Sequence, residues 1–284
     1  MAARSLFLNS EKTYILKAPI HVPSGNGFGA FASLLVLLTL SAPIVCAATS
    51  TKQNNNAALN LAASWDAFPG HADVAQWTSA VTAANNPSLG ADLSLLGLKI
   101  VNPGGLVTLG AGNTLTLGAS GVDLATASQD LILNCGLTLQ GQQSWKAAAG
   151  RSVNIAGTFT RNAATVDFTN FNSSAILGTL ANDASGILGS WATTGAATSL
   201  NYVQSSAGVL SAYSAQTVAT AANFGNVTNP LTNYSFAAAA TQVGAVTANT
   251  LRFTGSGGIS HHSDLRVSCG SIIGRNEVEI NGSR

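Results

Sequence analysis

The side chains best placed for acid–base chemistry are Asp123, Lys146 and Asp167. Lys146 follows Asp123, and Asp167 follows Lys146, at nearly equal intervals. In a coil whose turns match that interval, the three side chains would stack on one face. Glycoside hydrolysis requires carboxylates close in space, and a polysaccharide lyase would need a base beside a calcium-binding cluster. Because opposite charges are also commonly paired on exposed strands, we expect an outward structural ladder and no catalytic residues.

Metal and thiol chemistry have weaker candidates. His261 and His262 precede Asp264, but adjacent residues of an extended chain point to opposite faces, so the two imidazoles would not meet at one ion. Cys135 shares the parity of the apolar residues before it and is predicted to be a core residue. A disulfide with Cys269 is the alternative. We expect no metal and no cofactor.

A row of threonines raises the question of ice binding. Thr116, Thr138 and Thr160 are evenly spaced along the chain. The neighbouring series contains Thr108, but isoleucine and asparagine take the corresponding positions in the next two turns. The sequence therefore predicts a narrow row of threonines, which disfavours an ice-binding surface.

The elements that would position these residues are short strands in residues 98–159. Apolar residues two apart, the spacing that shares one face of a strand, recur along this stretch. They form three interleaved series, and the segments begin at Leu98, Val107, Leu115, Val122, Leu131, Leu137, Trp145, Val153 and Phe159. Glycine and asparagine separate them, as tight corners require. The pattern predicts an all-β fold, a parallel β-helix or β-solenoid with about three strands and about 22–24 residues per turn.

The composition supports a long aliphatic core and few reactive groups. Hydrophobic residues make up 46% of the 284 residues, but aromatic residues only 6%. Charged residues make up 8%, far below the roughly 25% of ordinary globular domains. The formal net charge is +1, which disfavours nucleic acid as a partner.

Residues 1–47 are predicted to form a signal peptide with a long charged n-region. Residues 28–48 carry no charge and contain a leucine-rich centre. Val45 and Ala47 take the two positions that a signal peptidase prefers, with cleavage before Ala48. An uncleaved anchor helix and a lipoprotein attached at Cys46 are the alternatives. After signal cleavage we expect no membrane span.

Four further regions follow. Residues 48–90 are predicted to form a flexible N-terminus and an aromatic cap, and residues 91–180 the regular β-helix repeats. Residues 181–258 alternate apolar and small polar residues less regularly and are expected to continue the coil. Residues 259–284 have the composition of a charged C-terminal tail, and a truncation before another repeat would explain them as well.

Trp65 and Trp77 stand out in a chain with so few aromatic residues. The first turn of a coil exposes an apolar end and unpaired strand edges, which bulky side chains would cover. We therefore predict that these tryptophans cap the coil, in preference to stacking on a ligand.

Several segments, in this order, resemble the autotransporter-associated β-strand repeat proteins of bacteria. They cover most of residues 64–258; the most specific are residues 69–77, 115–121, 129–131, 137–139, 143–145, 150–151, 189–193, 210–213 and 249–253. The resemblance implies a right-handed β-helical passenger on or outside the cell surface, with a structural or adhesive role more often than an enzymatic one.

These observations favour an exported, noncatalytic scaffold, secreted or at the cell surface, with a role in adhesion or in coating the cell envelope. Its partners would be surface glycans or other cell-surface proteins. A carbohydrate-active β-helix enzyme, either a polysaccharide lyase or a glycosidase, is the alternative.

Overall fold

The computed structural model describes residues 47–169, 176–178, 180–195, 199–219, 229–237, 240–242, 246–254, 259–261, 265–274 and 280–282. The chain divides into two units, residues 1–45 and 46–284, and the described residues all belong to the second. Apart from Ala47, the predicted signal peptide lies outside the described residues. His262 and Asp264 of the weighed metal site lie outside them too.

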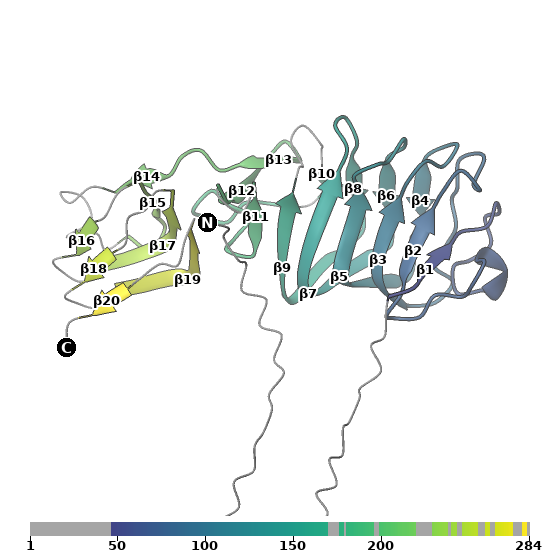
Figure 1. The fold of residues 1–284 in the computed structure, drawn as a ribbon, viewed down its shortest axis with the longest axis horizontal. Helices are drawn as coiled ribbons and strands as arrows, with labels where there is room; N and C mark the ends of the chain where they lie inside the picture. The colour runs from purple at the N-terminus through teal and green to yellow at the C-terminus, as the bar shows by residue number, and fades with distance from the viewer. Residues whose placement is uncertain are drawn as a thin grey trace, which may run out of the picture. The chain divides into compact units, whose positions relative to one another are not determined.

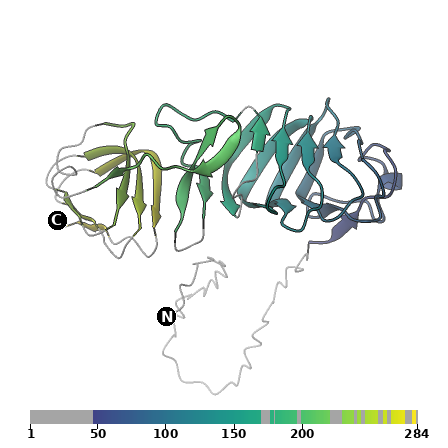
Figure 2. The same ribbon diagram turned by 90° about the horizontal axis from the view of Figure 1, so that it is seen from above.

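The described residues form a parallel β-solenoid of about six turns. Most strands of its main sheet lie side by side in Figure 1, and the same stack is seen from above in Figure 2. Among the described residues this sheet contains, in spatial order, β1 (Thr49–Thr51), β2 (Val74–Trp77), β3 (Leu93–Ile100), β5 (Thr114–Leu124), β7 (Gly136–Ala147), β9 (Phe159–Thr169), β11 (Ala192–Thr194), β12 (Asn201–Ser206) and β13 (Val209–Ala212). We call it the long-strand sheet.

A second sheet closes each turn and is called the short-strand sheet. Its described strands are β10 (Ile176–Gly178), β8 (Val153–Ile155), β6 (Leu131–Leu133) and β4 (Val107–Leu109). Each turn therefore has three straight segments, and two of them join into one bent strand. In β5 the bend falls near Gly121, whose φ of 57° is a conformation that glycine adopts readily.

The pairing confirms the predicted repeat. Leu98 pairs with Val122, Val107 with Leu131 and Leu115 with Leu137, which are the partners that the three series predict. The next turn keeps the same order, because Leu131 pairs with Val153 and Leu137 with Phe159. The register follows from burial: a slip by one residue would turn every apolar side chain outward.

The interior of the coil is a continuous aliphatic core. Leu115, Leu117, Val122 and Leu124 of β5 are each fully buried, and the corresponding residues of the other turns stack above and below them. Cys135 is a free thiol within this core, as predicted from its parity, so the disulfide alternative is excluded.

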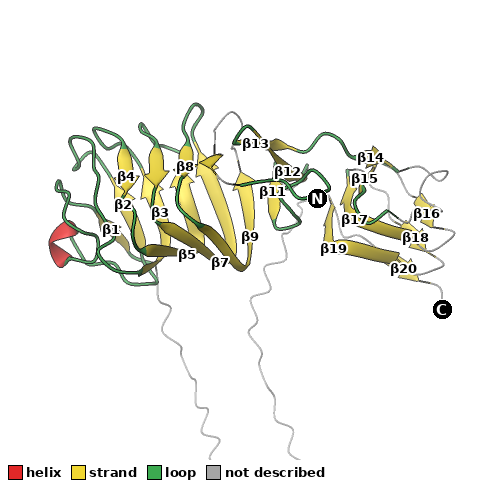
Figure 3. Ribbon diagram, turned by 180° about the vertical axis from the view of Figure 1, so that it is seen from behind, coloured by secondary structure: helices red, strands yellow, loops and turns green. Residues whose placement is uncertain are grey.

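The N-terminal end of the coil is covered by residues 52–90. Trp65 and Trp77 are buried and meet edge to face, with ring centroids 5.7 Å apart, so neither ring is available to a ligand. The short 3-10 helix η1 (Ala62–Ser64), red in Figure 3, precedes Trp65. The N-terminal part of residues 48–90 was expected to be flexible, but β1 lies within it and pairs with β2.

The first coil changes direction after β11. That strand pairs parallel with β9, whereas β12 pairs antiparallel with both β11 and β13. Parallel stacking then resumes in two smaller sheets, with fewer residues between paired positions than in the first coil. The described strands of the first are β14 (Thr217–Val218), β15 (Asn233–Phe236), β17 (Val246–Phe253) and β19 (Leu265–Gly274); those of the second are β16 (Ala240–Gln242), β18 (Ile259–His261) and β20 (Ile280–Gly282).

Residues 259–284 were expected to form a charged tail. Their described part continues the coil, because β18, β19 and β20 pair in parallel with the preceding strands or with each other. Within the described residues, no helix combines the length and the apolar character needed to cross a lipid bilayer.

Candidate functional site

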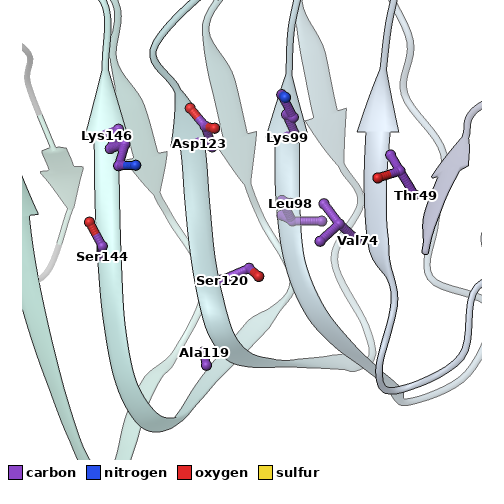
Figure 4. A pocket seen from close by; sticks show the side chains of 9 residues that line it. All are labelled: Thr49, Val74, Leu98, Lys99, Ala119, Ser120, Asp123, Ser144 and Lys146. Atoms are coloured by element: carbon purple, nitrogen blue, oxygen red, sulfur yellow. The ribbon is translucent and has the colours of Figure 1, made fainter. Parts of the chain in front are cut away.

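A groove of about 390 Å³ lies on the outer face of the long-strand sheet. Figure 4 shows that Lys99, Asp123 and Lys146 follow one another along it, from β3, β5 and β7. We call these three residues the charged row. Lys99 pairs with Asp123, and Asp123 with Lys146, so each stands about 4.8 Å from the next along the stack.

The strand pairing confirms the predicted contact of Asp123 with Lys146 but not that of Lys146 with Asp167. Asp123 and Lys146 are paired in neighbouring turns, as expected from their spacing. Asp167, however, is aligned with Ser144, and Lys146 is aligned with Thr169. The Asp, Lys, Asp ladder proposed from the sequence is therefore wrong, and the third charged member is Lys99.

A bulge in β9 accounts for part of the difference. The interval between paired residues of β7 and β9 lengthens from 22 to 23 residues after Gln140, and Ala163 has a φ of 52° at this bend. The apolar repeat at Val166 suggested an interval of 21 residues from Trp145, but Trp145 pairs with Phe168, 23 residues away. In the short-strand sheet Val153 likewise pairs with Ile176, where the sequence spacing suggested Ala175.

Two glycines lie at the same position in successive turns, each two residues before a member of the charged row. Val74 pairs with Gly97, and Gly97 with Gly121. Ser144 follows in the next turn, two residues before Lys146 as Gly121 is two residues before Asp123. A methyl group on Gly97 would come within 2.8 Å of the Gly121 carbonyl oxygen, and one on Gly121 within 2.9 Å of the Ser144 carbonyl oxygen. Close stacking of the turns therefore excludes larger residues here.

The remaining walls of the groove are hydroxylic and aliphatic. Ser120 lies at the bend of β5, and Ser144 lies beside Lys146. Thr49 and Val74 stand at the opposite end, on β1 and β2. The groove thus presents two cations, one carboxylate and several hydroxyl groups.

The described lysine and arginine side chains differ in whether they bond within the chain. The Lys52 ammonium, Arg151, Arg161 and Arg252 each donate a hydrogen bond to a carbonyl oxygen of this chain. Among the described side chains, Lys99 and Lys146 have no ion pair or hydrogen bond within the chain. Both of these lysines line the groove.

The described carboxylates, by contrast, are all engaged by the chain itself. Six of them accept a hydrogen bond from a backbone N–H group: Asp66, Asp73, Asp92, Asp123, Asp130 and Asp183. Asp167 accepts one from the Thr193 hydroxyl, at 3.4 Å.

Several of these bonds join neighbouring turns. The Asp92 carboxylate accepts from the Thr114 N–H at 2.8 Å, and the Asp130 carboxylate accepts from the Ser152 N–H at 2.9 Å. Asp130 also meets Arg151 in an ion pair of 3.6 Å. These carboxylates therefore link neighbouring turns at the corners of the coil.

The other candidate sites remain dispersed. Within the described ranges, no three side chains of the metal-binding types come together. Burial raises the pKa of the Cys135 thiol to about 11, so it carries no reactive thiolate at neutral pH. Thr116, Thr138 and Thr160 do pair in register, and Ser94 extends their row by one turn.

Sequence reasoning missed Lys99 and the two glycines of the groove. The signal was present, because Lys99 and Asp123 are separated by the same interval as Gly97 and Gly121. This is the interval already found between Leu98 and Val122. Extending that interval to the adjacent outward residues would have found the charged row.

No family model, no curated protein and no solved structure matches this chain. The autotransporter association therefore rests on the sequence resemblance of residues 64–258. By its described architecture, the chain is a β-solenoid repeat protein.

Proposed function

We propose that this protein is an exported, noncatalytic scaffold that acts at the cell surface or outside the cell, in adhesion or in coating the cell envelope. The observation that carries the proposal is the use of the carboxylates. Each described one accepts a hydrogen bond within the chain, and those of Asp92 and Asp130 join adjacent turns. Residues that elsewhere serve as acids and bases are here part of the framework.

The groove supports the same conclusion. Hydrolysis of a glycosidic bond by the usual mechanism needs two carboxyl groups on either side of the bond. Among the residues that line the groove, Asp123 is the one carboxylate. Its backbone partner, the Ala125 N–H at 2.9 Å, fixes its position in the strand. With a single carboxylate, the groove is better suited to binding a ligand than to hydrolysing one.

The cellular location is supported by the sequence. The leader of residues 1–47 has the features of an export signal, and the resemblance to autotransporter-associated repeat proteins implies a bacterial surface passenger. An aliphatic coil with few charges suits a long-lived structural component.

Antibody labelling of the source cells tests this function. Intact cells should be labelled, and mild protease treatment of intact cells should remove the signal. Cells that lack the gene should attach less well to glycan-bearing surfaces than cells that carry it. Labelling that requires permeabilised cells would contradict the proposal.

A further inference from the structure

We propose that the groove over β3, β5 and β7 binds acidic oligosaccharides through the carboxylates of their uronic acid units. This inference deepens the proposed function and rests on it, because a surface scaffold needs a recognition site for what it adheres to. It assigns the ligand class and the residues that select it: Lys99, Lys146 and Asp123.

Both lysines of the charged row are available to a ligand. Lys99 is half-buried and Lys146 is exposed, and within the described part of the chain neither has a bonded partner. The other described lysine and arginine side chains all donate hydrogen bonds to carbonyl oxygens. With Asp123 between them, the two lysines leave the charged row with a net charge of +1, which favours an anion.

The distance between the two lysines suits an extended acidic chain. Lys99 and Lys146 stand two turns apart, about 10 Å along the stack. This distance is comparable with the length of a disaccharide, so two carboxylates of an extended acidic chain can each meet one lysine. Asp123 lies between the two positions and can accept hydrogen bonds from sugar hydroxyl groups. Ser120 and Ser144 can donate hydrogen bonds to the ligand and accept them from it.

The shape of the groove suits a sugar ring. Gly97 and Gly121 leave two successive turns without a side chain beside the charged row, and Val74 offers an aliphatic surface at one end. A flat sheet would hold such a ligand by charge alone. The groove adds contact with the sugar ring.

An acidic peptide fits the same groove less well. Peptides commonly add to a free strand edge, but β3, β5 and β7 each have a hydrogen-bonded neighbour on both sides. A run of aspartate or glutamate residues would also offer Asp123 no hydroxyl group as a hydrogen-bond donor. The chemistry therefore favours a saccharide, whose hydroxyl groups can pair with that carboxylate.

Isothermal titration of the purified full-length mature protein tests the proposal. The probe is trigalacturonic acid, and its fully methyl-esterified form is the uncharged control. Binding should occur with the acid and not with the ester. Each lysine should contribute about threefold in affinity, so the double variant Lys99→Gln/Lys146→Gln should bind about tenfold more weakly. Lys99→Arg/Lys146→Arg should retain most of the affinity.

Asn154→Asp is the matched control. It makes the net charge more negative by one unit, as one Lys→Gln substitution does, but it lies on the short-strand sheet, where Asn154 pairs with Ile132. This variant should bind like the wild type. Thermal unfolding of each variant establishes that the coil is intact.

Three results would overturn the proposal: no binding of the acid, equal binding by the Lys→Gln double variant, or tighter binding of a glutamate-rich peptide than of the sugar. Surface labelling and cell attachment that persist in the double variant would overturn the groove inference while leaving the scaffold function standing.

Discussion

Among single residues, Lys52 is in the least ordinary environment. Its side chain is fully buried in the N-terminal cap. The ammonium donates hydrogen bonds to the Gln53 carbonyl at 3.1 Å, the Asn55 carbonyl at 2.6 Å and the Asn55 side-chain oxygen at 2.8 Å. Burial lowers the pKa of Lys52 to about 8. The cap thus contains a cation that pays a desolvation cost at neutral pH.

This environment predicts how stability changes with pH. Between the folded pKa of about 8 and the ordinary value of 10.5, the unfolded chain binds the proton that the folded chain has released. The free energy of unfolding should therefore rise from pH 8 to pH 10, by at most about 3 kcal/mol. Urea unfolding of the wild type and of Lys52→Met, compared at each pH, isolates this contribution.

In Lys52→Met the rise between pH 8 and pH 10 should disappear. At pH 7 the variant should lose about 1–3 kcal/mol, because the Asn55 oxygens lose their donor. Lys99→Met, which removes a lysine without a bonded partner, should keep the wild-type pH dependence. Parallel pH profiles for the wild type and Lys52→Met would contradict the assigned environment.

The two tryptophans predicted the aromatic part of this cap, but composition gave no sign of its polar part. Residues 48–63 are rich in asparagine and alanine, a composition typical of a flexible segment. Here the asparagines bond across the end of the coil: the Asn85 amide donates to the Asn55 carbonyl, and the Trp77 indole donates to the Asn85 oxygen. Such long-range partners have no local sequence pattern.

At the scale of the strand, parity decides which side chains are buried. Leu133 of β6 is fully buried, whereas Thr138 of β7 lies on the outward parity between Thr116 and Thr160. The two residues are close together in the sequence. They form a matched pair for testing the register.

Leu133→Asp should unfold the coil, because an unpaired charge in an aliphatic core costs several kcal/mol. Thr138→Asp should change the free energy of unfolding by less than about 1 kcal/mol. Circular dichroism during thermal unfolding of both variants measures the difference. Equal tolerance at the two positions would overturn the register.

The strand register was predictable where the interval stayed constant and unpredictable where it changed. The repeating parity of Leu115, Leu137 and Phe159 gave the correct pairing from the sequence. The alternation at Val166 and Phe168 suggested a shorter interval than the strands have, and the bulge at Ala163 lengthened that interval by one more residue, so Asp167 was placed on the wrong partner. A bulge adds one residue without an apolar marker, so spacing alone does not locate it.

At the scale of the molecule, the described chain contains two parallel stacks separated by an antiparallel hairpin. The hairpin of β12 and β13 ends the first stack, since its second strand no longer offers a parallel partner. The interval between paired residues is shorter in the second stack, which explains why the rhythm of the first blurred in the sequence. The alternation of apolar and small polar residues, as at Leu251 and Phe253, still indicated strands there.

The function proposed for the whole molecule follows from what its polar residues do. Carboxylates form hydrogen bonds between turns, and tryptophans cover the N-terminal end of the coil. Two lysines remain available on the outer face of the long-strand sheet. We therefore infer that the protein binds its ligand without turnover.

Turnover itself is the most direct test. The purified protein is incubated with a panel of acidic and neutral polysaccharides, with and without Ca²⁺, and new reducing ends and unsaturated products are measured. We expect no products above those of a blank prepared identically from cells that lack the gene. Product formation that disappears in Asp123→Ala or Lys146→Ala would contradict this expectation and would identify the groove as an active site.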